Sequence, residues 1–142
     1  MDHQALGIQL FNRTWELFDS RGSDDELIHT AHASAYHWAQ VGTAANRARS
    51  EWLCARVYSV LGRAEPALHH AHRCLELVEA HPDAMDGWDL PAAYEAVARA
   101  ELLAGDREAA ARAAQAGRAA LGGIADEEDR RPIEGDLASL EI

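Results

Sequence analysis

Alanine is the feature that most constrains how this chain can fold. It supplies 30 of the 68 apolar residues, so only 38 larger apolar side chains remain to build a core. Alanine is the strongest helix former, whereas valine, isoleucine and threonine, which favour strands, together number only 13. We therefore predict an all-α fold, in which small side chains let neighbouring helices approach closely.

Breaks in the pattern divide the chain into seven segments of helical length. They are rich in glycine, proline and small polar residues and fall near residues 19–23, 41–43, 61–63, 81–88, 104–106 and 121–123. Ser23, Thr43, Asp89 and Asp106 stand where N-terminal caps are needed. These residues predict the starts of four of the helices.

The segments group into antiparallel hairpins. We expect hairpins over residues 2–41, 43–80 and 89–121, followed by a capping helix over residues 125–140. Pro132 is expected to kink or split this last helix. Because no linker separates the segments, residues 1–142 are predicted to form one domain.

Two of the hairpins share a pattern of small residues at an offset of 43 positions. The first carries Ala55, Tyr58, Gly62 and Ala67, and the second carries Ala98, Glu101, Gly105 and Ala110 in the same slots. Small residues at these points allow two helices to cross tightly, because bulky side chains would force the axes apart. The spacing therefore predicts a repeat.

The small–aromatic–glycine–alanine spacing of residues 55–67 resembles the tetratricopeptide repeat, over about residues 48–121 and more loosely in the opening hairpin. The resemblance implies hairpins stacked as a short right-handed superhelix, with a concave groove for a peptide or a partner protein. The period of 43 differs from the 34 of the family, Glu101 replaces an aromatic residue, and Glu79 and Gly122 stand where a closing proline is usual. The stretch from His32 to Trp38 resembles stand-alone bacterial proteins of this kind.

Carboxylates on apolar helix faces are the most informative anomaly. Glu51 and Tyr58 share a face in one repeat, and Tyr94 and Glu101 take the equivalent slots in the next. An ionised carboxylate on such a face needs a partner, because its desolvation is costly. Two outcomes are open: a polar ligand groove, or a buried network with arginines and histidines. The groove candidates are Glu51, Tyr58, Tyr94, Glu101 and Arg56.

The same anomaly has a fallback interpretation. If Glu51 and Glu101 are buried and paired, the partner surface must be sought elsewhere, for example on the arginines Arg47, Arg49 and Arg56. The four tryptophans, Trp15, Trp38, Trp52 and Trp88, are assigned to the core or to wedges between helices.

Histidines suggest an alternative function. His29, His32 and Tyr36 form one stripe at positions i, i+3 and i+7 of a helix. A divalent transition metal between the first two hairpins would use His29, His32, Glu51 and His70, with Tyr36 or Tyr58 nearby. The alternative is structural, with histidines at the border of the apolar face that bond to neighbouring helices. His70 also lies one turn from Cys74, but mid-helix and without oxyanion donors.

Composition limits the remaining functional classes. All 13 basic residues are arginine, against 24 acidic residues, and the formal charge of −11 disfavours a nucleic-acid partner. No apolar run approaches the ~20 residues that span a bilayer, and the start of the chain lacks a signal-peptide pattern. Cys54 and Cys74 match no zinc or redox spacing, so we expect a cytoplasmic protein. No catalytic residue is assigned, no cofactor is predicted, and self-association into a homo-oligomer is a third possibility.

Overall fold

Seven α-helices account for the regular structure of the chain. The computed structural model describes residues 1–142 and contains no strand. The helices are α1 (His3–Ser20), α2 (Asp24–Val41), α3 (Ala44–Val60), α4 (Ala64–Ala80), α5 (Asp89–Leu103), α6 (Arg107–Ala120) and α7 (Glu127–Ser139). Two short 3-10 turns, η1 (Pro82–Ala84) and η2 (Leu121–Gly123), precede α5 and follow α6. The all-α fold predicted from the alanine content is confirmed.

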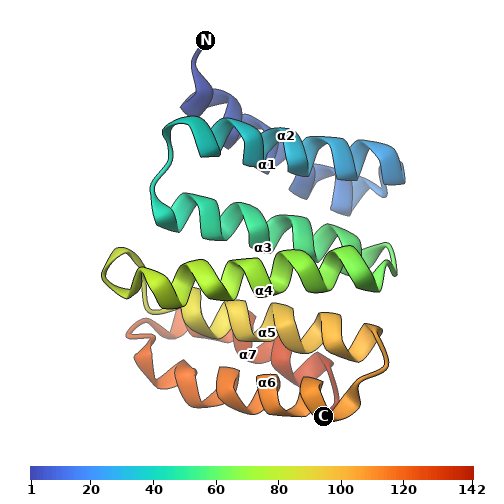
Figure 1. Cartoon of the computed structure of the whole chain (residues 1–142), viewed down its shortest axis with the longest axis vertical. Coiled ribbons are helices and arrows are strands. Elements are labelled where there is room, and N and C mark those ends of the chain that lie inside the picture. Colours follow the sequence, from blue (N-terminus) through green and yellow to red (C-terminus); the bar gives the residue numbers. More distant parts are fainter.

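Consecutive helices pack against each other as a stack of hairpins. The pairs α1–α2, α3–α4 and α5–α6 form the hairpins, and α2–α3 and α4–α5 join one hairpin to the next. The first helices α3 and α5 also touch directly, and α7 packs on α5 and α6. Figure 1 shows the stack running from α1 and α2 at the N-terminal end to α6 at the other, with α1 behind α2 and α7 behind α5.

Small residues lie where the sequence pattern requires close helix crossings. Ala55, Ala67, Ala98 and Ala110 are each at most 1% exposed. The two glycines at the hairpin turns, Gly62 and Gly105, have φ angles of +73° and +89°, a region that side chains rarely adopt. The offset of 43 residues therefore marks a structural repeat, in which the same turn follows the same crossing.

Three of the four predicted N-terminal caps are confirmed, whereas the predictions for Asp89 and for Pro132 are not. The side chains of Ser23, Thr43 and Asp106 each accept a hydrogen bond from a backbone N–H in the first turn of the next helix. Asp89 is the first residue of α5 rather than its cap, and it is 4% exposed. Pro132 lies inside α7, which continues without a break from Glu127 to Ser139. Both residues instead face the groove described below.

The core divides into clusters between successive hairpins. One cluster lies between α1, α2 and α3, with Leu17, Leu27 and Leu53 among its buried members. A second joins α3, α4 and α5, and a third joins α5, α6 and α7 around Ile133 and Leu137. No helix is both long and apolar enough to cross a membrane. Since α3 and α5 bury side chains against α4 and α6, one remaining face of these first helices is left to form a groove.

Candidate functional site

On its side toward the second helices, α3 contributes a half-buried polar cluster. A carboxylate oxygen of Glu51 lies 2.6 Å from Nδ1 of His70 on α4. The hydroxyl of Tyr58 lies 2.9 Å from Nε2 of His32 on α2. Glu51 therefore bonds to the second helix of its own hairpin, and Tyr58 bonds to the second helix of the preceding hairpin.

The next repeat follows the same rule with the residue types exchanged. Tyr94 packs beside Gly117 on α6, in its own hairpin. Glu101 lies 3.2 Å from Nε2 of His72 on α4, in the preceding hairpin. The carboxylates are partly buried, with side-chain exposures of 26% for Glu51 and 17% for Glu101. The structure thus places Glu51, Tyr58 and Glu101 in side-chain contacts between helices, while Tyr94 lines a hollow between α4, α5 and α6.

The predicted metal ligands come together only in part. The rings of His32 and His70 are 5.2 Å apart in an edge-on arrangement, and Tyr58 stacks on His70. Burial lowers the pKa of His32, and the neighbouring imidazoles of His70 and His29 lower it further while Glu51 opposes them. No group of three or more His, Cys, Asp or Glu side chains is arranged to hold a metal ion. The cluster as it stands is a hydrogen-bonded contact between three helices.

Both thiols are buried and unpaired. Sγ of Cys54 is 3.9 Å from Nδ1 of His32, yet burial raises the pKa of Cys54 to about 12, and Glu51 raises it as well. Burial also raises the pKa of Cys74 to about 12. Because the thiolate is the nucleophile, these shifts argue against nucleophilic chemistry at either position.

The opposite face of the first helices contains a cavity of about 370 Å³, which we call the tryptophan cavity. Trp15 from α1 stacks on Trp52 from α3, with ring centroids 6.0 Å apart, and Trp88 precedes α5. The cavity is lined by Phe11, Trp15, Ala48, Arg49, Trp52, Cys74, Trp88, Asp89, Ala92, Glu128, Asp129, Pro132, Ile133 and Asp136. Its walls therefore come from α1, α3, α5 and α7, together with Cys74 of α4.

Arg49 anchors one wall of the tryptophan cavity. Its guanidinium donates two hydrogen bonds to the carboxylate of Asp89, at 3.0 and 2.8 Å, and a third to Asp86 at 2.9 Å. The same group lies 4.3 Å from the ring centroid of Trp88. The hydrogen bond with Asp89 is the main cause that raises the pKa of Arg49. The buried Asp89 carboxylate thus has a fixed counter-charge, and its cavity-facing position explains why it does not act as a cap.

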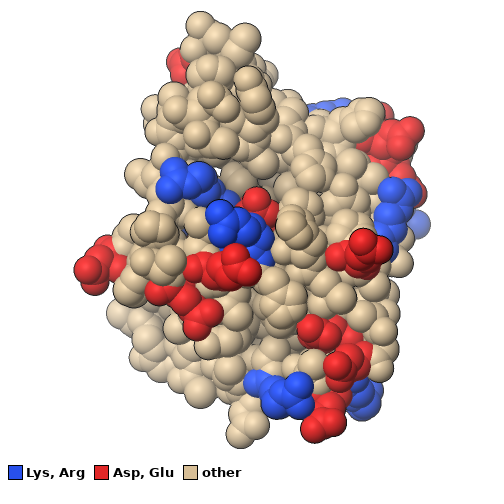
Figure 2. All heavy atoms as spheres, viewed as in Figure 1, with Lys and Arg blue, Asp and Glu red and all other residues tan.

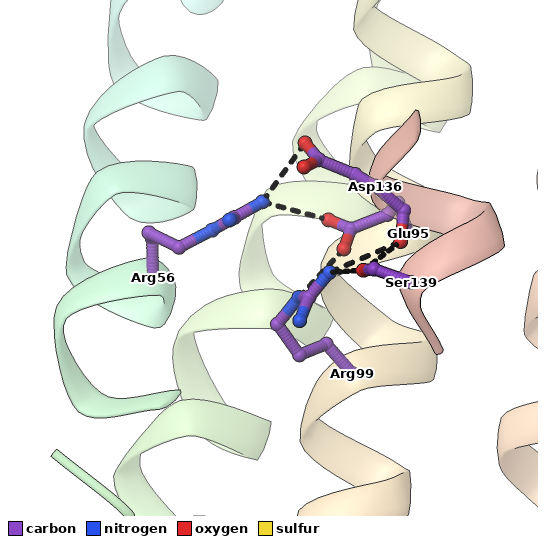
Figure 3. A network of polar contacts seen from close by, with 5 residues as sticks. All are labelled: Arg56, Glu95, Arg99, Asp136 and Ser139. Atoms are coloured by element: carbon purple, nitrogen blue, oxygen red, sulfur yellow. Dashed lines mark hydrogen bonds and ion pairs between the residues drawn. The ribbon is translucent and has the colours of Figure 1, made fainter. Parts of the chain in front are cut away.

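A second ion-pair network fixes α7 beside the cavity (Figure 3). Arg56 on α3 contacts the carboxylates of Glu95 and Asp136, each at 3.2 Å. Arg99 contacts Glu95 at 2.7 Å and also donates to the backbone oxygen of Asp136 and to Ser139. Glu95 is 1% exposed, and burial raises the pKa of its carboxyl while Arg56 and Arg99 oppose the shift. The network connects three helices that are distant in sequence.

Sequence reasoning missed most of this face, although a signal for it exists. Arg49, Trp52 and Arg56 recur at i, i+3 and i+7 of a helix, and Arg99 stands 43 positions after Arg56. Glu95 occupies the slot 43 positions after Trp52. The repeat offset alone could therefore have identified this face, whereas the tryptophans were predicted only as core residues or wedges between helices.

On the face drawn in Figure 2, acidic and basic side chains form small groups of both signs, and the part over α1 and α2 is largely uncharged. Consistently, the sequence from Ile28 to Val41 contains no Asp, Glu, Lys or Arg.

Comparison of the chain with protein-family models, with curated proteins and with solved structures finds no match.

Proposed function

We propose that the chain is a tetratricopeptide-like binding module, whose groove between α1, α3, α5 and α7 takes a peptide segment of a partner protein. The tryptophan cavity carries this proposal. Stacked hairpins create an extended concave surface, and the cavity volume of about 370 Å³ falls within the range of ligand sites. Arg56, one of the groove candidates, does not line this cavity; it borders a separate hollow of about 410 Å³ between α3, α5 and α7.

The chemistry of the cavity suits a peptide. Tryptophan and arginine are among the residues that most often dominate binding energy at interfaces. Here Trp15 and Trp52 come from α1 and α3, and Arg49 of α3 is held by its ion pair with the buried Asp89.

Two further expectations belong to this proposal. We place the binding in the cytoplasm, where the two free thiols, Cys54 and Cys74, stay reduced. The histidine cluster contains no three-ligand arrangement and does not support the alternative of a metal site. A second copy of the chain is the competing occupant of the groove.

The test is selection of binders from a phage-displayed library of random peptides against the whole chain. Ala92 lines the cavity and is partly exposed, so the substitution Ala92→Phe fills the site. The matched control is Ala111→Phe, on an exposed position of α6. We expect selected peptides to bind the wild type and Ala111→Phe equally, and to lose about tenfold or more in affinity with Ala92→Phe.

Trp15→Ala provides a second variant, because Trp15 is 39% exposed and its loss removes a wall without opening the core. It should weaken the same peptides, with circular dichroism confirming that the helices are retained. Enrichment of no peptide, or peptides that ignore both cavity variants, would contradict the proposal. Light scattering that shows a dimer broken by Ala92→Phe would assign the groove to a second copy instead.

A further inference from the structure

The charge of the tryptophan cavity points to the chemistry of its occupant. Resting on the function proposed above, we propose that the cavity binds a basic side chain, arginine or lysine, of the partner peptide. Four carboxylates line the cavity (Asp89, Glu128, Asp129 and Asp136), against a single arginine, Arg49. An acidic lining of this kind attracts a cation and repels an acidic segment.

The arginines near the cavity neutralise only part of this negative charge. Arg49 is shared between Asp86 and Asp89, and Arg56 is shared between Glu95 and Asp136. Glu128 and Asp129 at the cavity wall make no ion pair with any residue of the chain, and both are exposed. The cavity therefore has carboxylates available for a charge that the chain does not supply.

The indole rings of the cavity walls also attract a cation, in addition to the carboxylates. Two of the indoles already have a guanidinium nearby: Arg49 lies 4.3 Å from the ring centroid of Trp88, and Arg56 lies 5.1 Å from that of Trp52. A cation within about 6 Å of an indole face is attracted by its quadrupole. Trp15, the most exposed of the three, is the indole left for a cation from outside.

The lining of the groove changes along its length, because acidic residues line the tryptophan cavity but not the hollow beside it. A smaller hollow of about 170 Å³ adjoins α1 and is lined by Ile8, Phe11, Asn12, Trp38, Asn46, Arg49 and Ser50. Ile8 at this end is 46% exposed, and none of the lining residues is acidic. Apolar residues of the peptide should therefore lie in this smaller hollow, and its basic residue in the tryptophan cavity.

Glu128 and Asp129 also stand in the first turn of α7, where acids stabilise a helix N-terminus. Glu127 shares that role but faces outward, pairs with Arg131 at 3.5 Å and does not line the cavity. The chain thus offers a control for the helix effect. Glu127→Gln removes one acid from the same turn, whereas Glu128→Gln with Asp129→Asn removes the two carboxylates of the cavity that have no ion-pair partner.

The experiment uses three synthetic peptides with the same leucine-rich frame and a central pair of arginine, citrulline or glutamate residues. Citrulline keeps the shape of arginine without its charge. Calorimetric titration of the full chain at low salt should show the arginine peptide binding about tenfold tighter than the citrulline peptide, and the glutamate peptide weakest. The double variant should reduce the arginine peptide to the citrulline level, and Glu127→Gln should leave it unchanged.

The outcomes separate this inference from the function on which it rests. Equal binding of the arginine and citrulline peptides, or an equal loss with Glu127→Gln, overturns the inference. If the synthetic peptides fail but library-selected peptides without basic residues bind in the cavity, the binding function stands and the inference is wrong. If neither kind of peptide binds, both fail.

Discussion

The two polar sides of the first helices α3 and α5 differ in the partners that their carboxylates have. Toward the second helices, Glu51 has one histidine partner and a side-chain exposure of 26%. Toward the groove, Glu95 on α5 meets two arginines, Arg56 and Arg99, at an exposure of 2%. The more deeply a carboxylate is buried, the more fixed positive charge surrounds it here.

This difference follows from the cost of desolvation. A fully buried carboxylate loses its hydration, and only close, permanent charges with several hydrogen bonds compensate for the loss. A half-exposed carboxylate keeps some water, so a single imidazole suffices. The groove face consequently pairs its buried carboxylate with two arginines, whereas the face toward the second helices pairs its partly exposed carboxylates with single histidines.

The largest expected effect on stability comes from removing the Glu95 and Glu51 carboxylates one at a time. Glu95→Ala leaves Arg56 and Arg99 without their shared partner and should cost about 3–5 kcal/mol of unfolding free energy. Glu51→Ala removes a single hydrogen bond from a half-exposed site and should cost about 1–2 kcal/mol. Urea denaturation measures both values.

The control for that pair is Glu108→Ala, whose exposed ion pair with Arg112 should contribute less than about 1 kcal/mol. Equal losses for Glu95→Ala and Glu51→Ala would refute the link between burial and partner strength. Circular dichroism should show that each variant keeps its helix content, so that only folded proteins are compared.

The two cysteines test whether a neighbouring histidine makes one side reactive. Cys54 adjoins His32, while Cys74 lines the tryptophan cavity, and burial raises the pKa of each to about 12. At pH 8 we expect both to react with a thiol reagent about a thousandfold more slowly in the folded protein than in urea. Single Cys54→Ala and Cys74→Ala variants assign the rates; rapid labelling of Cys54 alone would show that His32 activates it.

The smallest expected effect is the contribution of His32 to the pH dependence of stability. Burial lowers the pKa of folded His32, so the unfolded chain takes up its proton first as the pH falls through about 6.5. Stability should therefore fall between pH 7 and pH 5. Glu51, Cys54 and Tyr58 of α3, His70 of α4 and His29 of α2 face this imidazole.

His32→Gln should flatten this dependence. Glu95 contributes with the opposite sign, because burial raises its folded pKa and the native state then binds a proton before the unfolded chain does. The difference between wild type and His32→Gln removes that contribution, along with those of the other histidines. If the two proteins lose stability equally on acidification, His32 is not the group responsible.

Much of the architecture followed from local patterns. The seven helices, the hairpin order and the small residues Ala55, Ala67, Ala98 and Ala110 all emerged from composition, caps and the offset of 43. The site was found less completely. Glu51 and His70 do meet, but Glu95 and the place of the tryptophans around a cavity were not predicted, because an isolated helix pattern does not show which face remains open.

Sequence by itself determined what each segment forms, since helix propensity, caps and positive-φ glycines act over a few residues. Only the tertiary structure decided which face became the groove and which carboxylate met which partner. Glu51 meets a partner 19 positions away, and Arg56 reaches Asp136 across 80 positions. Such pairings depend on how the helices cross and on how deeply each carboxylate is desolvated, and both are set when the hairpins stack.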